Sequence, residues 1–146
     1  MKTFIESQFN YCPLVWMFHS RDLNQKINKL HERALRVVYN NNSLTFQQLL
    51  VEDGSFTIHE RNLQKLVLEM YNIKNNLSPP PLKELFIPAT RGKHDWAEPR
   101  VRTVNRGLET MRYRGPETWK LLSESIRKAK TLAINHMASE VDLPAC

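Results

Sequence analysis

Apolar residues recur every three or four positions through most of the first ninety residues, which is the spacing of α-helices that bury one face. This pattern predicts helices over residues 4–18, 23–39, 44–50 and 57–75, with one further turn over residues 82–86. In the second segment, the residues expected to form the buried stripe are Ile27, Leu30, Ala34, Val37 and Val38. Sustained alternation of apolar and polar residues is almost absent, so a mainly helical fold is expected.

The ends of these helices carry recognisable signals. The run Asn40-Asn41-Asn42 should end the second helix, because Asn tolerates a left-handed backbone and bonds locally. Ser43 is then expected to cap the next helix. Thr57 and Glu60 fit a capping box, in which each residue binds the backbone amide of the other.

The segment over residues 4–18 has the densest apolar pattern. One face is expected to be buried, and it is formed by Ile5, Phe9, Cys12 and Trp16. Pro13 lacks an amide hydrogen, so the helix should bend or divide near Tyr11. Apolar side chains also extend beyond one face, which predicts an exposed patch that favours self-association. The expected members of this patch are some of Tyr11, Leu14, Met17 and Phe18.

The rest of the chain is less regular. Residues 87–100 contain three Pro or Gly residues and no period, which predicts a loop or hinge. Partial alternation allows one small β-hairpin near residues 101–113, and Gly115-Pro116-Glu117 is expected to open a helix that buries Trp119. The predicted fold is therefore mainly α, with five or six helices in one domain and at most this hairpin. Its expected parts are a helical region (1–86), a loop or hinge (87–100), a basic extension (101–135) and a frayed tail (136–146).

The net charge of +6 is concentrated late in the chain, where residues 91–130 hold 11 of the 21 Lys and Arg residues. Such a cluster favours a polyanionic partner, most commonly nucleic acid, although a basic surface can also serve solubility alone. Four cations lie at helical spacing on one stripe, namely Lys26, Lys29, Arg33 and Arg36. The alternative is an ordinary exposed helix face whose charge is neutralised by Glu32 and solvent. A second cluster joins phosphate-binding Arg side chains to an aromatic ring that can stack on bases. Its members are Arg100, Arg102, Arg106, Arg112, Tyr113 and Arg114.

Patterns for catalysis, metal binding or phosphate loops are missing from the sequence. The five His and two Cys residues show no zinc-ligand spacing, and only 4 Gly are present. The one adjacent acidic pair, Glu52-Asp53, precedes Gly54 and is expected in a turn instead of a two-metal site. Cys12 is expected to be a buried, inert thiol. We therefore expect no cofactor, no metal and no enzymatic activity from this chain on its own.

The sequence favours an intracellular protein without membrane association. No apolar run approaches the roughly 18 residues of a membrane-spanning helix. The first residues, MKTFIESQ, lack the apolar stretch of a signal peptide. The two cysteines, at opposite ends, form no disulfide framework. Nucleus and cytoplasm are not distinguished.

Five stretches, taken in order, resemble one known family. They are FIESQFNYCPLVWMFHSR, INKLHERALRVVYNN, TIHERNLQKLVLEMYNIKNNLSP, VRTVNRG and RYRGPETWKLLSESIRKAKTL. Together they resemble the segment that follows the polymerase core in reverse transcriptases of jockey-like non-long-terminal-repeat retrotransposons. In that family the segment forms the thumb and its extension, which hold template and primer, while the catalytic carboxylates lie in the preceding palm.

The resemblance implies a non-catalytic fragment of an RNA-directed DNA polymerase. Its two basic clusters would contact RNA or an RNA–DNA duplex, and the palm of the parent polymerase would be a further partner. Relatives continue with a basic helix and a Cys-rich tail, whereas this chain continues with AINHMASEVDLPAC, so no zinc-knuckle role is expected. Met1-Lys2-Thr3 resembles an internal position of the family. Two alternatives stay open: a helical protein–protein interaction module and a non-functional retrotransposon remnant.

Overall fold

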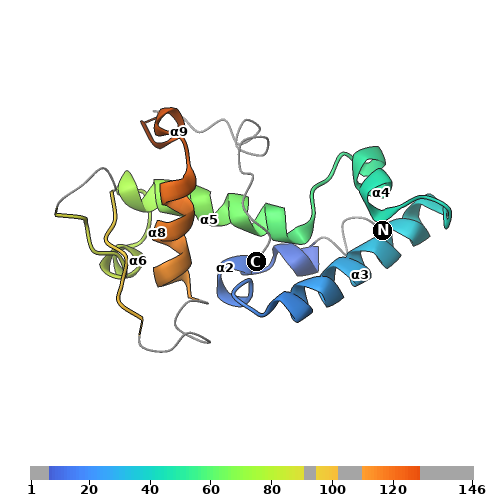
Figure 1. Cartoon of the computed structure of the whole chain (residues 1–146), viewed down its shortest axis with the longest axis horizontal. Coiled ribbons are helices and arrows are strands. Elements are labelled where there is room, and N and C mark those ends of the chain that lie inside the picture. Colours follow the sequence, from blue (N-terminus) through green and yellow to red (C-terminus); the bar gives the residue numbers. More distant parts are fainter. Residues whose placement is uncertain (1–6, 91–94, 102–109, 129–146) are drawn as a thin grey trace. The chain divides into compact units, whose positions relative to one another are not determined.

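The computed structural model describes residues 7–90, 95–101 and 110–128, and these are mainly helical (Figure 1). The helices are α2 (Pro13–Trp16), α3 (Arg21–Tyr39), α4 (Phe46–Asp53), α5 (Ile58–Lys74), α6 (Pro80–Glu84), α8 (Met111–Leu121) and α9 (Glu124–Lys128). Residues 7–10 are helical as well. Across these three ranges no strand forms, and the β-type pairing is a single bridge between Pro88 and Trp96. The predicted mainly α class is confirmed.

The internal contacts of the chain divide it into two compact units, Met1–Asn62 and Leu63–Cys146, which are described separately. The predicted division into a helical region, a loop, a basic extension and a tail stays a prediction. It rests on the function expected of each part, and contacts within the chain do not test function. The tail, residues 136–146, lies outside the described residues.

Pro13 divides the first predicted helix, as expected. The helical turn at residues 7–10 ends before Tyr11, and α2 begins with Pro13 at its first position. Between them Cys12 has a left-handed backbone, with φ of 42°. The Trp16 indole donates a hydrogen bond of 2.7 Å to the Tyr11 carbonyl and closes the break. The prediction that Cys12 is buried is wrong, because the break turns this thiol outward and leaves it exposed.

Helix α3 has the expected length but buries a different side. It ends at Asn40, whose φ of 49° confirms the predicted left-handed cap. Leu30, Val37 and Val38 were expected in the core, yet they are 54%, 66% and 38% exposed. The buried residues are His31 and Leu35, which lie farther around the helix. The apolar band of α3 is wider than one buried stripe, and packing covers only one of its edges.

The buried edge of α3 packs against α4 within the first unit. Leu35, Leu49 and Leu50 form the core there, supported by Tyr39, Leu44 and Phe46. The His31 ring lies edge-on to the Phe46 ring, with 5.7 Å between centroids. A buried imidazole therefore occupies a position that hydrophobic periodicity alone assigns to an aliphatic residue.

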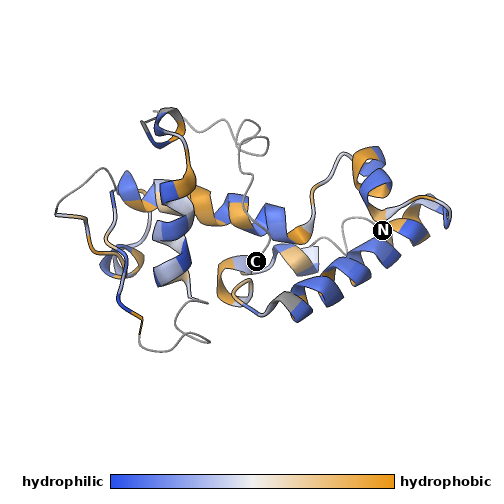
Figure 2. Ribbon diagram, viewed as in Figure 1, coloured by the Kyte–Doolittle hydropathy of each residue, from blue (hydrophilic) through white to orange (hydrophobic). Residues whose placement is uncertain are grey.

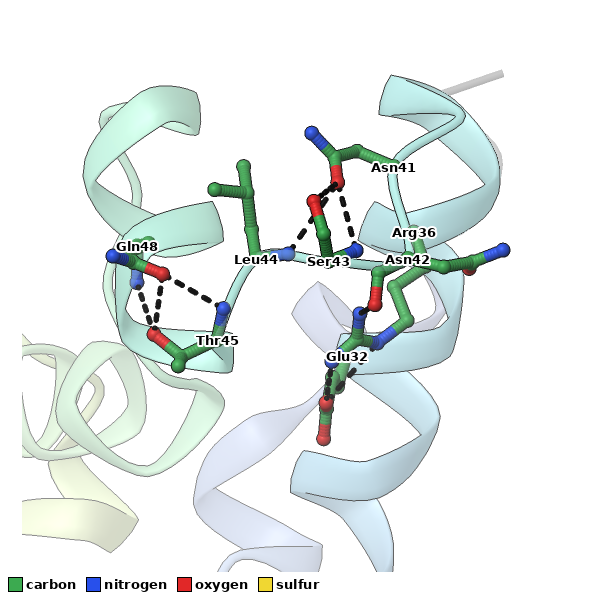
Figure 3. Close-up of polar contacts among 8 residues, drawn as sticks. All are labelled: Glu32, Arg36, Asn41, Asn42, Ser43, Leu44, Thr45 and Gln48. Atoms are coloured by element: carbon green, nitrogen blue, oxygen red, sulfur yellow. Dashed lines mark hydrogen bonds and ion pairs between the residues drawn. The ribbon is translucent and has the colours of Figure 1, made fainter.

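The turn between α3 and α4 is held by polar contacts (Figure 3). Asn41 Oδ1 accepts hydrogen bonds from the Ser43 amide, the Ser43 hydroxyl and the Leu44 amide at 2.9, 2.8 and 3.3 Å. Thr45 and Gln48 then form a capping box at the start of α4. Thr45, and not Ser43 as predicted, is therefore the cap, because the Ser43 hydroxyl is engaged by Asn41.

The capping box predicted before α5 is present. The Thr57 amide donates to Glu60 Oε2 at 2.8 Å, and the Glu60 amide donates to Thr57 Oγ1 at 3.2 Å. The helix then runs to Lys74, close to the predicted end. Two amides at the start of the helix, which have no partner within the helix itself, are satisfied by this exchange.

The core of the second unit gathers residues from α5, α8 and the segments between them. Its buried members are Val67, Met70, Tyr71, Ile73, Phe86, Trp119 and Leu122. Gly115 allows α8 to approach α5 closely, since a Cβ at this position would lie only 2.7 Å from Met70 Sδ. The predicted burial of Trp119 is confirmed at 2% exposure.

The β-hairpin proposed near residues 101–113 is wrong in its second half. Helix α8 begins at Met111, and Pro116 lies inside it instead of opening it. Residues 102–109 lie outside the described residues. Met111 packs on the core, and Gly115, Thr118, Trp119 and Leu122 are buried after it. That spacing is helical, and it outweighs the short alternation of Arg112, Tyr113 and Arg114.

Candidate nucleic-acid interface

The exposed side of α3 carries three cations, which we name the α3 cationic row: Lys26, Lys29 and Arg33. All three side chains are exposed, and none forms an ion pair within the described part of the chain. Their spacing of three and four residues places them on one side of the helix. In Figure 2 most of the α3 ribbon has the blue colour of hydrophilic residues. The row therefore presents positive charge to solvent that no ion pair among the described residues compensates.

Arg36, the fourth predicted cation of this stripe, has a different role. Its Nη2 lies 2.6 Å from Glu32 Oε1, and its Nη1 donates to the Asn42 carbonyl at 2.9 Å (Figure 3). The guanidinium therefore pairs with a carboxylate one turn earlier and satisfies a carbonyl beyond the end of α3. Arg36 stabilises the turn into α4, and its charge is partly neutralised.

The second predicted cluster is only partly brought together. Arg112 and Tyr113 lie in the first turn of α8, where Arg112 is exposed and Tyr113 is half-buried. Arg114 pairs with Glu117 at 3.1 Å, one turn along the same helix. Arg100 is exposed on the segment before α8, and Arg102 and Arg106 lie outside the described residues. The accessible charge in this cluster comes from Arg100 and Arg112.

A polar cluster in the second unit was not predicted from the sequence. Asp95 Oδ2 accepts hydrogen bonds from the Trp119 indole at 2.7 Å and from Lys74 Nζ at 3.0 Å. Lys74 also donates to the Arg127 carbonyl at 3.0 Å and lies 5.5 Å from the centroid of the Trp119 ring. These contacts tie α5, the segment before α8, and α9 together around the Trp119 ring. Asp95 lies in a stretch without periodicity, so no pattern identified it.

The pKa of Asp95 is lower than its ordinary value of 3.8. Burial acts in the opposite direction and raises it. The hydrogen bonds from Trp119 and Lys74, with the positive charges of Lys74 and Arg127, outweigh that effect. Asp95 is therefore a structural anion, held in its charged form by its neighbours.

An open cavity of about 540 Å³ lies beside this cluster. Its charged lining residues are Lys74, Lys83, Glu84 and Asp95, two of each sign. Lys83 is further engaged by the Asn76 side chain at 2.6 Å. The cavity thus lacks the excess of positive charge that would select a phosphate backbone, and the α3 cationic row is the stronger candidate.

Glu52 and Asp53 are the last two residues of α4, so they lie in the helix and not in the predicted turn, which begins at Gly54. Asp53 accepts a hydrogen bond of 2.6 Å from the Tyr39 hydroxyl, and Gly54 follows with φ of 63°. Among the residues that the structure describes, no three His, Cys, Asp or Glu side chains are grouped closely enough to hold a metal ion. In the same ranges no helix combines the length and the apolar character needed to cross a bilayer.

Comparisons of the chain with protein-family models, with curated proteins and with solved structures find no match. The relationship to reverse transcriptases therefore stays a prediction that rests on the sequence resemblance.

Proposed function

We propose that this chain is the thumb and post-thumb segment of an RNA-directed DNA polymerase of the non-long-terminal-repeat type. In this role it binds the template–primer duplex through phosphate contacts and performs no chemistry on its own. The observation that supports the proposal most is the α3 cationic row, with its exposed charges and no ion pair within the described residues. Cations that neutralise phosphates release condensed counterions, which supplies most of the affinity for a duplex of any sequence.

The row is long enough to face several base-pair steps of a duplex. Lys26 and Arg33 are seven residues apart, about 10 Å along a helix axis. Measured along the axis of a B-form duplex, that distance corresponds to about three base-pair steps of about 3.4 Å each. Arg33 adds a planar group that can bind one phosphate through two hydrogen bonds.

Helix α8 offers a second contact in the proposed role. Arg112 is exposed at the start of the helix, and Tyr113 follows it with a half-buried ring. An Arg with an adjacent aromatic ring suits a strand end, where a base is free to stack. Arg114 contributes less, since Glu117 compensates its charge.

Binding of a labelled RNA–DNA duplex tests the proposal. We expect the affinity of the full chain to fall steeply between about 50 and 200 mM salt. The triple substitution Lys26→Gln, Lys29→Gln and Arg33→Gln should weaken binding and reduce the slope of log affinity against log salt by about 2 to 3.

The matched control keeps every charge: Lys26→Arg, Lys29→Arg and Arg33→Lys should leave the salt slope close to that of the wild type. Absence of salt-sensitive binding at micromolar protein would contradict the proposed function. An unchanged slope in the glutamine variant would exclude α3 as the contact surface.

A further inference from the structure

The exposed side of α3 also carries aliphatic residues that phosphate binding does not use. Leu23, Leu30 and Val37 are 46%, 54% and 66% exposed, and they recur at seven-residue intervals beside the α3 cationic row. We name them the α3 apolar row. Exposed aliphatic side chains that lie together along one helix line indicate a surface where a partner binds.

The apolar row belongs to a heptad pattern. Ile27 and Ala34, both half-buried, fall between its members, so the apolar spacing along α3 is four, three, four and three. This is the a and d spacing of a helix that packs against another helix. Lys26 and Arg33 then occupy g positions, where side chains face the charged groups of a partner helix.

Only one flank of this seam carries charged residues, because the e positions on the other flank are Asn24, His31 and Val38. The opposite flank includes His31, which is 2% exposed and packs against the Phe46 ring in the core of the first unit. A partner helix therefore meets charge on one side alone, and that charge is positive. Carboxylates are the groups that complement it.

We propose that α3 binds an amphipathic α-helix of a partner protein, whose apolar face covers the α3 apolar row and whose Glu or Asp residues face Lys26 and Arg33. A second copy of the chain fits less well. Antiparallel α3 helices would place cations opposite cations, and parallel helices would require the flank that His31 buries.

The seam is short, because Leu23 and Val37 lie about 21 Å apart along the helix axis. Two heptads of contact make a small interface, so we expect a reversible complex. The inference does not rest on nucleic-acid binding, since its apolar contacts come from residues that a duplex leaves uncovered. The shared use of Lys26 and Arg33 makes the two ligands compete.

The test uses two synthetic three-heptad peptides with Leu at a and d. One carries Glu at e and g, and the other carries Lys there. Fluorescence anisotropy with the full chain should show at least tenfold tighter binding of the Glu peptide. Equal affinity, preference for the Lys peptide, or no binding of the Glu peptide at about 100 µM would overturn the proposal.

Two variants separate the apolar from the charged contribution. Leu23→Gln with Leu30→Gln and Val37→Gln should weaken Glu-peptide binding at least tenfold and leave duplex binding unchanged, because Gln preserves helix propensity and the cations remain. An unchanged peptide affinity would overturn the proposal. Loss of duplex binding in this variant would instead count against the phosphate-contact model.

Lys26→Glu with Arg33→Glu should reverse the preference, so that the Lys peptide binds more tightly than the Glu peptide. A misfolded variant cannot gain such binding, so this result is independent of any effect on stability. Failure to reverse the preference would overturn the charge assignment. The proposal would also be overturned if the chain formed a dimer in sedimentation and the variant with Gln at Leu23, Leu30 and Val37 did not. That result would show that a second copy of the chain covers the α3 apolar row.

Discussion

Gly115 lets α8 lie against the core of the second unit because it has no side chain. A Cβ there would lie 2.7 Å from Met70 Sδ and 3.1 Å from Phe86 Cε1. Met70 is fully buried, so its sulfur cannot move away without displacing its neighbours. The absence of a methyl group at one position therefore sets the approach of two helices.

Gly115→Ala should lower the free energy of unfolding of the chain by about 1 kcal/mol. Overpacking costs about 1 to 3 kcal/mol, and the higher helix propensity of Ala offsets about 1 kcal/mol of it. Urea denaturation followed by circular dichroism measures the difference. In a Met70→Ala background the same change should cost little or stabilise, and an equal loss in both backgrounds would show that Met70 is not the cause.

Asp95 should make the stability of the chain depend on pH in the acid range. Its folded pKa is below 3.8, so its contribution is fully present above about pH 3.8 and is lost as pH falls through the folded pKa. Asp95→Asn should therefore be less stable than the wild type at pH 7, and the difference should shrink below pH 3.8. Thermal unfolding across pH measures both.

A matched carboxylate serves as the control for Asp95. Glu98 pairs with Lys120 at 3.1 Å, but both side chains are nearly half exposed. Glu98→Gln should change stability little at any pH, because solvent screens this pair. A larger effect from Glu98 than from Asp95 would refute the assignment of Asp95 as the structural anion.

At the scale of elements, the helix ends are decided by neighbouring residues. Pro13 starts α2, Asn40 ends α3, and Thr57 with Glu60 starts α5. Each effect acts through the backbone within a few residues, so the sequence alone predicted these positions. The buried side of α3 depends on where α4 packs, and periodicity could not choose between the two edges of a wide apolar band.

The same distinction applies to the candidate site. The stripe of cations on α3 was predicted from helical spacing, and Glu32 was expected to compete for the stripe, but only the structure shows that Arg36 is its partner. The cluster around Asp95 could not be read, since its members are 21 to 53 residues apart in the chain. Contacts between residues this far apart produce no periodic pattern in the sequence.

The capping box before α5 gives a prediction at this scale. Thr57→Ala should lower the free energy of unfolding by about 1 kcal/mol, because the Glu60 amide loses its acceptor. Thr57→Ser keeps the hydroxyl and should retain most of the stability. Denaturant unfolding of the two variants beside the wild type measures the difference, and equal losses would show that the hydroxyl is not the stabilising group.

At the scale of the whole molecule, several large apolar side chains are exposed to solvent. The predicted patch near the start of the chain is correct for Tyr11, which is 76% exposed, and wrong for Met17, which is buried. Leu14 and Phe18 are half-buried. Val15, which was not proposed, is 81% exposed. The accessible part of the patch is therefore formed mainly by Tyr11 and Val15.

Self-association through this patch remains a prediction. The wild-type chain should show a weight-average mass that rises with concentration in sedimentation equilibrium. Tyr11→Gln with Val15→Gln should reduce that rise, because it removes the most exposed apolar area of the segment. A wild-type chain that stays monomeric at high concentration would contradict the prediction.

The contacts around Asp95 also bear on the order in which the chain acquires its structure. Lys74 meets Asp95 and the Arg127 carbonyl, which lie 21 and 53 residues later in the chain, whereas α3 and α4 meet within a short stretch of chain. Closing a long loop costs more conformational entropy than closing a short one, and this cost arises before the new contact can offset it. We therefore expect the α3–α4 pair to form early and the bonds to Asp95 to form after the chain on both sides of it has collapsed. Contacts that form after the transition state for folding mainly lower the rate of unfolding.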